Sequence, residues 1–504
     1  MTTRRAFLAG STATAALTLA PVAFPANAAG AVTRTITGHL DPGAADWVYL
    51  PVDVPRGVRE VRVAYTYDKP SVPAGTLTNS CDIGIFDERG VELGGDGFSG
   101  WSGGFRTEFA IAADTATPGY LPGPVNPGRW HVILGPYQVS PQGLTYRVTV
   151  TLTYGRPAPR YRPDYPPQQV RGTSRRWYRG DCHLHTVYSD GKRLPAEVAA
   201  GARAAGLDFI VSTDHNTSAS HGVWGPLAGD DLLILTGEEI TTRNGHVLAL
   251  GLEPGHWIDW RYRSTDGEFA RFAREIHRDG GLVVPAHPYC PYVGCRWKFG
   301  YDDADAIEVW NGPWTVDDEA AVETWDAQLV TAAHGTGRWL PALGNSDAHS
   351  EPQVIGLPQT AVLADSLSRG ALLTAIAAGR SYLAESSAVT VELTASAGGR
   401  SAGVGERLRV RPDEPVTVTV RAAGVPNGVV RLITDGGQLQ QTQLPASGDG
   451  VVTLRTTAQL AAYVRAEVRH PLADGSPGSG TAMGTVPQLG AMAALTNPVW
   501  LGRR

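Results

Sequence analysis

Between residues 177 and 387, short apolar runs alternate with helical patterns, and most of the runs end in a histidine or a carboxylate. Runs such as DFIVSTD and GLVVPAH are continuously apolar, as in strands that are buried on both faces. Alternation of such strands with helices favours a parallel sheet or barrel. In such folds, polar residues at the carboxyl ends of the strands form the functional site. The helical patterns cover residues 195–206, 266–279, 317–334 and 368–379.

The residues at the strand ends are those of a multinuclear metal site. In GDCHLHT, His183 and His185 are two positions apart and share one face of a strand. Imidazole and carboxylate ligands without a thiolate suit zinc, manganese or iron. Three carboxylates crowded among six histidines need cations to offset their charge. The expected ligands are His183, His185, Asp190, His215, Glu239, His246, His287, Asp347 and His349.

The series HxH, SDG, DHN, GH, AHP and SDAH, with a glutamate after a strand, resembles the polymerase and histidinol phosphatase (PHP) superfamily of metal hydrolases. The resemblance covers residues 177–387 and is greatest to the exported CehA/McbA-like branch. It implies a distorted (β/α)7 barrel that holds two or three divalent metal ions. His183, His185, Glu239 and Asp347 would hold one metal, and Glu239 would bridge to a second metal held by His246 and His287. Asp190, His215 and His349 would hold the third, and Glu238 is the alternative to Glu239 as the bridging ligand.

The function that the resemblance implies is a phosphoesterase, in which a metal-bridging hydroxide attacks a phosphodiester or phosphomonoester. Glu239, Asp347 and Asp190 are the carboxylates expected to take part in catalysis. A carbamate or carboxylic-ester hydrolase would use the same hydroxide on a carbonyl carbon. Candidate contacts to the small-molecule substrate are Asn311, Arg243, Arg296, Lys298 and Asn345.

Segments rich in β-type patterns flank the central segment and give a multidomain fold of α/β plus β type. Residues 31–155 and 388–504 carry short runs separated by Gly and Pro, which predict an N-terminal and a C-terminal β-sandwich. Residues 156–176 are rich in Pro and Arg and predict an extended linker.

A non-catalytic protein that binds cell wall or glycan is a different class of function for this chain. Aromatic side chains of the N-terminal segment could stack on sugars, although sandwich cores use the same residue types. The aromatics in question are Trp47, Trp101, Tyr120 and Trp130.

Residues 1–28 resemble a twin-arginine signal peptide. Arg4 and Arg5 precede an apolar stretch, and Ala26-Asn27-Ala28 supplies a cleavage pattern of small residues. We expect export by the twin-arginine machinery to the cell envelope or the exterior, with an uncleaved signal anchor as the alternative. No later apolar run has the length of a membrane span. The net charge of −6 and the lack of a basic cluster argue against a nucleic-acid partner.

Four cysteines are too few for a disulfide framework in a chain of 504 residues. Cys290 and Cys295 either close a small loop beside His287 or remain separate thiols, while Cys81 and Cys182 are expected to be buried. The pattern GxSxG at 100–104 lacks the strand and helix that a nucleophile elbow needs. Four further histidines are expected to be structural: His221, His256, His277 and His334.

Overall fold

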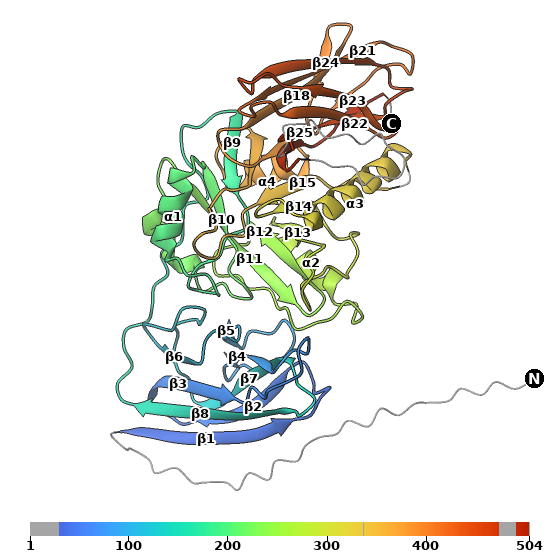
Figure 1. Ribbon diagram of the computed structural model, residues 1–504. Helices are drawn as coiled ribbons and strands as arrows, with labels where there is room; N and C mark the ends of the chain where they lie inside the picture. Colours follow the sequence, from blue (N-terminus) through green and yellow to red (C-terminus); the bar gives the residue numbers. More distant parts are fainter. Residues whose placement is uncertain (1–29, 336, 473–489, 503–504) are drawn as a thin grey trace, which may run out of the picture.

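The computed structural model describes residues 30–335, 337–472 and 490–502, which form an elongated molecule of three stacked parts (Figure 1). The expected signal peptide lies outside these residues. Strands predominate, and four α-helices accompany them in the described ranges. In this described portion, no helix is long and apolar enough to cross a membrane.

The N-terminal part consists of two antiparallel four-stranded sheets that pack face to face. Residues of both sheets alternate between a shared apolar core and solvent, as the strict alternation of 144–154 shows. The sheet orders are β1-β8-β3-β6 and β2-β7-β4-β5. The strands are β1 (Ala31–Leu40), β2 (Val48–Val54), β3 (Val58–Tyr67), β4 (Ser80–Phe86), β5 (Phe98–Ser102), β6 (Glu108–Ala112), β7 (Gly128–Gln138) and β8 (Leu144–Tyr154).

Residues 156–175 run between the first two parts without helix or strand. Backbone hydrogen bonds attach this segment to both of them. Tyr161 N donates to Ala113 O of the N-terminal part at 2.8 Å, and Asp164 N donates to Gly222 O of the central part at 2.8 Å. The segment therefore has no regular secondary structure and is held to both parts at fixed points.

The central part contains the four predicted helices, each within a few residues of its expected bounds: α1 (Pro195–Ala204), α2 (Phe269–Arg278), α3 (Val316–Ala333) and α4 (Arg369–Ala377). Pro195 occupies the first turn of α1, where its missing N–H costs nothing. In α2, Phe269, Phe272, Ala273 and Ile276 form the buried face.

Most strands of the central part form a mixed sheet rather than the expected parallel one. Strands β9-β10-β11 are parallel, but β12, β13, β16 and β17 join antiparallel. Only Arg243 and Asn244 separate β11 from β12, and a connection this short joins antiparallel strands only. The strands are β9 (Arg176–Asp181), β10 (Phe209–Ser212), β11 (Leu233–Thr242), β12 (Gly245–Leu250), β13 (Leu282–Ala286), β14 (Ile307–Asn311), β15 (Ala342–Asn345), β16 (Gln359–Ala364) and β17 (Ser381–Ala384).

Strands β14 and β15 form a separate parallel pair. Strand β14 lies beside β13, and β15 lies beside β16 and β17, without ladder hydrogen bonds in either place. The strands therefore surround a common centre, but their hydrogen-bonded ladders do not close into a (β/α)7 barrel in the described residues.

The C-terminal part pairs a sheet of order β19-β18-β21-β24 with the strands β26-β25-β22-β23 over one apolar core. Because β17 pairs with β26, the central sheet continues into this part across the boundary expected at residue 388. The strands are β18 (Thr390–Ala397), β19 (Arg400–Gly403), β20 (Arg407–Leu408), β21 (Val416–Ala423), β22 (Val429–Thr434), β23 (Gly437–Gln443), β24 (Gly450–Thr456), β25 (Tyr463–Arg469), β26 (Met492–Thr496) and β27 (Val499–Leu501).

A buried ion cluster joins the C-terminal part to α3. The carboxylate of Glu467 accepts hydrogen bonds from Arg431, Arg465 and Arg469 at 2.7–2.9 Å. Arg469 also contacts Glu319 on α3. Such a cluster is stable only while every charge keeps its partners.

Candidate metal centre

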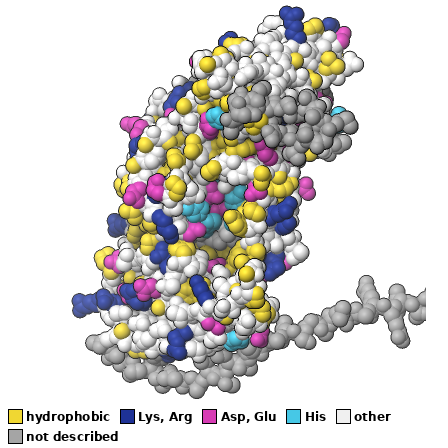
Figure 2. Space-filling view, in the orientation of Figure 1, with side chains coloured by type: hydrophobic (Ala, Val, Ile, Leu, Met, Phe, Trp, Pro, Cys, Tyr) yellow, Lys and Arg dark blue, Asp and Glu magenta, His cyan; other side chains and the backbone are white. Residues whose placement is uncertain are grey.

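The nine expected ligands converge beyond the ends of strands β9, β10, β13 and β15 and near the turn of the β11–β12 hairpin. His183 and His185 follow β9, whereas Glu239 lies within β11. His287 and Asp347 follow β13 and β15 with positive φ angles of 27° and 49°. Non-glycine residues rarely adopt such angles, and they gather at functional sites. Figure 2 shows histidine and acidic side chains gathered near the middle of one face.

Four of these residues form a compact buried cluster. The Nε2 atom of His183 lies 3.1 Å from Glu239 Oε2 and 3.2 Å from Asp347 Oδ1. The Nε2 atom of His185 lies 3.3 Å and 2.9 Å from the same two oxygens. None of these four atoms has a hydrogen-bond partner of acceptable geometry, although all are buried. Each atom without a partner costs about 1–3 kcal/mol, which a cation at their centre would offset.

The carboxylate of Glu239 also faces a second pair of histidines. Its Oε1 atom lies 2.8 Å from His246 Nδ1 and 3.1 Å from His287 Nε2. Its two oxygens thus point to two different sets of imidazoles, as a bridging carboxylate would. The neighbouring carboxylate of Glu238 points away and accepts a hydrogen bond from Ile258 N at 2.9 Å. Burial raises the pKa of Glu238 well above its usual value, so Glu239 is the ligand that this geometry favours.

The third group surrounds Asp190. Its Oδ1 atom lies 3.2 Å from His349 Nε2 and 3.6 Å from His215 Nε2. This oxygen is buried and has no hydrogen-bond partner. Together with His185, these residues place their ligand atoms within 4.8 Å of one another, close enough to hold a metal ion. All nine expected ligands are thus brought together, and their donor types suit a divalent cation.

Glu308 on β14 is a part of the site that the sequence analysis missed. Its Oε1 atom lies 3.1 Å from His183 Nδ1 and accepts from Asn345 Nδ2 at 2.9 Å. Its Oε2 atom accepts from Asn311 Nδ2 at 3.0 Å and from His287 N at 2.9 Å. A carboxylate beside Nδ1 fixes the ring and directs Nε2 towards a metal. The sequence held one signal for this role, which is that Glu308 is the only carboxylate in the apolar run AIEVWNG. A buried strand accommodates a charged side chain only where hydrogen-bonding or ionic partners surround it.

Two further carboxylates, also missed, hold the loops that carry the ligands. Asp181 accepts hydrogen bonds from Ser346 Oγ at 2.5 Å and from Gly356 N at 2.8 Å. Asp214 accepts from Thr186 N and Ser189 Oγ, both at 2.8 Å. These bonds tie the loop after β9 to the loops after β10 and β15, which sets the separation of the ligands.

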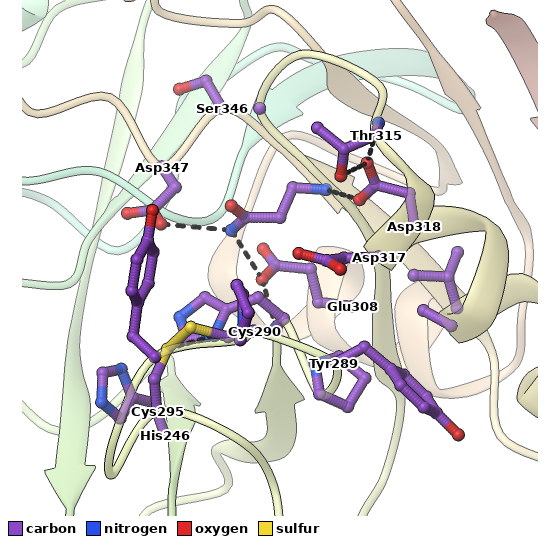
Figure 3. A pocket seen from close by; sticks show the side chains of 18 of the residues that line it. His246, Tyr289, Cys290, Cys295, Glu308, Thr315, Asp317, Asp318, Ser346 and Asp347 are labelled. Carbon is purple, nitrogen blue, oxygen red and sulfur yellow. Dashed lines mark hydrogen bonds between the residues drawn. A yellow bond between two sulfur atoms is a disulfide. The ribbon is translucent and has the colours of Figure 1, made fainter. Parts of the chain in front are cut away.

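Two cavities flank the cluster. The first, of about 440 Å³, is bounded by α3, the loop after β13 and the ligands (Figure 3). The second, of about 390 Å³, lies towards the N-terminal sheets. Both cavities share His215, His246, Tyr292 and Cys295. A disulfide joins Cys290 to Cys295, which decides between the two expected states of these cysteines; Cys81 and Cys182 are buried thiols, as expected.

Of the five residues expected to contact the substrate, two line a cavity and three do not. Asn311 lines the first cavity and donates to Asp347 Oδ2 at 3.2 Å, and Arg243 lines the second cavity. Asn345 is wholly buried and holds Glu308 and the backbone N–H of Cys182, so it acts behind the ligands. Arg296 stacks over Tyr289. Arg296 and Lys298 are exposed and do not line either cavity, so their expected contact with the substrate stays a prediction.

The histidines expected to be structural lie outside the cluster. His221 accepts from Gly255 N and donates to Gly237 O, and burial lowers its pKa to about 4. His256 contacts Asp279 and Glu275, and His277 contacts Asp305. His334 caps the C-terminus of α3.

The N-terminal aromatics and the GxSxG serine also have defined places. Ser102 donates to Tyr120 Oη, which in turn donates to Ile83 O, so the acceptor of its proton is a tyrosine hydroxyl and not a general base such as histidine. Tyr120, Trp130 and Trp101 are buried, whereas Trp47 is partly exposed. Of the four aromatics, Trp47 and Trp101 line the second cavity.

Comparison with solved structures finds partial similarities. One is a two-domain protein from Bacteroides vulgatus that contains a predicted PHP-like metal-dependent phosphoesterase; it is 18% identical, with 64% of this chain and 97% of that chain covered and a TM-score of 0.34. A protein from Bifidobacterium adolescentis, provisionally named a metal-dependent phosphoesterase, is 21% identical, with 35% and 90% covered and a TM-score of 0.26. An amidohydrolase from Chromobacterium violaceum with bound sulfate is 20% identical, with 35% and 89% covered and a TM-score of 0.25. Neither a family model nor a curated protein matches this chain.

Proposed function

We propose that this protein is a metal-dependent phosphoesterase of the PHP type, in the exported CehA/McbA-like branch. The observation that carries the proposal is a set of buried polar atoms that converge without hydrogen-bond partners. A cation shared among them would remove the cost of burying them without partners. The atoms are His183 Nε2, His185 Nε2, Asp190 Oδ1, Glu239 Oε2 and Asp347 Oδ1.

The residues of the site have separable roles in this proposal. His183, His185, Glu239 and Asp347 would hold one cation, and His246 and His287 would share Glu239 with a second. Asp190, His215 and His349 would complete a third position. When bound, such cations supply Lewis acidity and lower the pKa of a water molecule. Zinc, manganese and iron all suit these ligands.

The side chains of the protein hold that arrangement in place. Glu308 keeps Nδ1 of His183 engaged, so that Nε2 faces the centre. Asn311 donates to both Glu308 and Asp347, and its amide lines the first cavity, where a substrate oxygen would lie. Asp190 completes the set of carboxylates on the side of the second cavity.

The first experiment measures metal content and turnover of the purified chain. We expect two or three divalent ions per chain, and hydrolysis of bis-p-nitrophenyl phosphate or p-nitrophenyl phosphate. His183→Ala and Asp347→Ala should remove both metal and turnover. Glu238→Gln is the matched control, because this buried carboxylate points away from the cluster. Turnover of naphthyl carbamate alone would replace the phosphoesterase with a carbamate hydrolase.

A non-catalytic glycan-binding function has less support. Two of the four N-terminal aromatics, Tyr120 and Trp130, are buried in the sandwich core. If the chain binds no metal and shows no turnover after manganese or zinc is added, the phosphoesterase proposal fails and the glycan-binding function becomes the better one.

Export by the twin-arginine machinery is a second element of the proposal and rests on the sequence of residues 1–28. Replacing Arg4 and Arg5 by lysine should retain the protein in the cytoplasm of a host that has this machinery. Fractionation of the host followed by immunoblotting measures this. Unchanged export of the double variant would show that the motif is not used.

A further inference from the structure

The second cavity joins the metal centre to the N-terminal sheets. Trp47, Phe105 and Tyr137 of the N-terminal part form one side of it, and the metal ligands His215 and His246 form another. A substrate bound at the cluster therefore has a neighbouring space built by a different part of the chain. At about 390 Å³, this space is sufficient for one ring and its substituents.

Arg243 is the cationic group in this cavity. It lies in the two-residue turn between β11 and β12, three positions before His246, so the metal centre and the guanidinium are fixed by one hairpin. Its guanidinium lies 5.1 Å from the ring centroid of Trp47 and 4.3 Å from that of Tyr137. These two rings restrict its position.

The guanidinium of Arg243 has unused hydrogen-bonding capacity. Among the described residues it makes one hydrogen bond, at 3.5 Å to Asp46 O, and its buried Nε–H has no acceptor. Native proteins rarely leave a buried donor unsatisfied, and such groups are common where a ligand supplies the missing acceptor. Arginine has five donors in a planar fork, which suits a carbonyl or similar acceptor.

Asp82 on β4 supplies an acceptor to the same cavity. Within the described ranges it has no ion pair, so the nearby Arg243 does not neutralise it through direct contact. The cavity thus offers a donor, an acceptor and aromatic walls. A ring whose edge carries both a carbonyl and an N–H satisfies all three features. A carboxylate on the ring would satisfy Arg243 but would be repelled by Asp82.

We propose that the second cavity is a subsite for a ring-bearing substituent of the substrate, whose edge places an acceptor at Arg243 and a donor at Asp82. The subsite rests on the proposed function, because the ester group of the substrate lies at the cluster. Aromatic walls select for a ring, and the two polar side chains select for its edge.

Phosphonates test this subsite because their C–P bond resists hydrolysis. Titration calorimetry on the metal-loaded full chain compares methylphosphonate, phenylphosphonate, 4-carbamoylphenylphosphonate and 4-carboxyphenylphosphonate. We expect phenyl to bind about 10-fold more tightly than methyl, and carbamoylphenyl about 5-fold more tightly again. The carboxyphenyl compound should bind more weakly than the carbamoyl compound.

Variants assign the gain in affinity to named side chains. Arg243→Gln should abolish the gain from the carbamoyl group and keep the gain from the ring, and Asp82→Asn should remove the discrimination against carboxylate. Phe105→Ala should reduce the gain from the ring, and because the residue is 42% exposed, little buried packing is lost. Arg296→Gln is the control, since this arginine stacks over Tyr289 and does not line either cavity.

Equal affinity for methyl, phenyl and carbamoylphenyl phosphonates would overturn the subsite, as would an order of affinity that Arg243→Gln leaves unchanged. If no phosphonate binds, saturation-transfer NMR with benzamide decides the matter. Binding of benzamide that is lost in Arg243→Gln would support the subsite while the phosphoesterase proposal fails. No such binding would overturn the subsite. Ester turnover without any ring preference would leave the phosphoesterase standing and remove the subsite alone.

Discussion

Replacing Glu308 by glutamine should weaken metal binding without removing a proposed ligand. The carboxylate holds His183 Nδ1 at 3.1 Å and accepts from Asn345, Asn311 and the backbone of His287 at 2.9–3.0 Å. Glutamine keeps the shape, but it has one acceptor oxygen and brings an NH2 group towards donors that are already present. Loss of such a supporting carboxylate typically costs 10- to 100-fold in metal affinity, or about 1.4–2.7 kcal/mol.

A chelator-competition titration with zinc or manganese measures this loss. Glu238→Gln is the matched control, because it changes a buried carboxylate next to Glu239 that points away from the cluster. The control should bind metal within twofold of the unaltered chain. The reasoning fails if Glu308→Gln also binds within twofold, or if both variants lose affinity equally, since the effect would then be one of general packing.

Three further perturbations have expected outcomes. Glu467→Gln leaves the buried Arg465 and Arg469 and the partly buried Arg431 short of a partner, and should lower the free energy of unfolding by about 3 kcal/mol in denaturant titrations at pH 7. Burial would raise the pKa of Glu467, but Arg469, Arg465 and Arg431 hold it at about 2. The contribution of the ionised carboxylate to stability is therefore complete above the unfolded pKa of about 4.5 and is lost as pH falls towards 2. A loss of stability in Glu467→Gln that is as large at pH 3 as at pH 7 would refute this pH dependence. A hydrogen bond to Glu275 raises the pKa of His256 to about 9, and Asp279 adds to this effect, while burial opposes it. Its contribution is complete below about pH 6.5 and is lost as pH rises through 9, so His256→Gln should cost about 1 kcal/mol at pH 6 and less at pH 10; a deficit that grows with pH would contradict this. Chelation of the metal should remove about 2.7 kcal/mol when free metal had been 100-fold above its Kd, seen as a lower thermal midpoint that added metal restores; an unchanged midpoint would count against a metal that supports the fold.

The convergence of the nine candidate ligands could be predicted from the sequence because most of them lie in short motifs beside apolar runs. His183 and His185 share a face through simple strand alternation, and strand ends that point to one centre bring distant motifs together. The helices could be predicted for a similar reason, since the buried face of α2 repeats at 3.6 residues. Such signals are local, so a single sequence contains them.

The direction of the strands could not be predicted in the same way. A run buried on both faces is apolar whether its neighbours are parallel or antiparallel, and HVLALGL is such a run. The turn of Arg243 and Asn244 was the signal for a hairpin, but Gly245 follows that pair, and the expected two-residue turns have glycine within them. The sequence therefore does not distinguish this tight turn from a longer connection to a parallel strand.

Roles that depend on distant parts of the chain were the hardest to predict, and Glu308 and Arg243 show two reasons. Glu308 supports His183 across 125 positions of sequence, so nothing near either residue reveals the pair. Arg243 could be named as a substrate contact because it lies near His246, yet its environment comes from Trp47 and Tyr137 in a separate part of the chain. Arg243, whose partners are distant in sequence, lines a cavity. Arg296, nine positions after His287, stacks instead on the nearby Tyr289. Proximity to a ligand in sequence thus identifies candidates, and what the rest of the fold packs around each one decides its role.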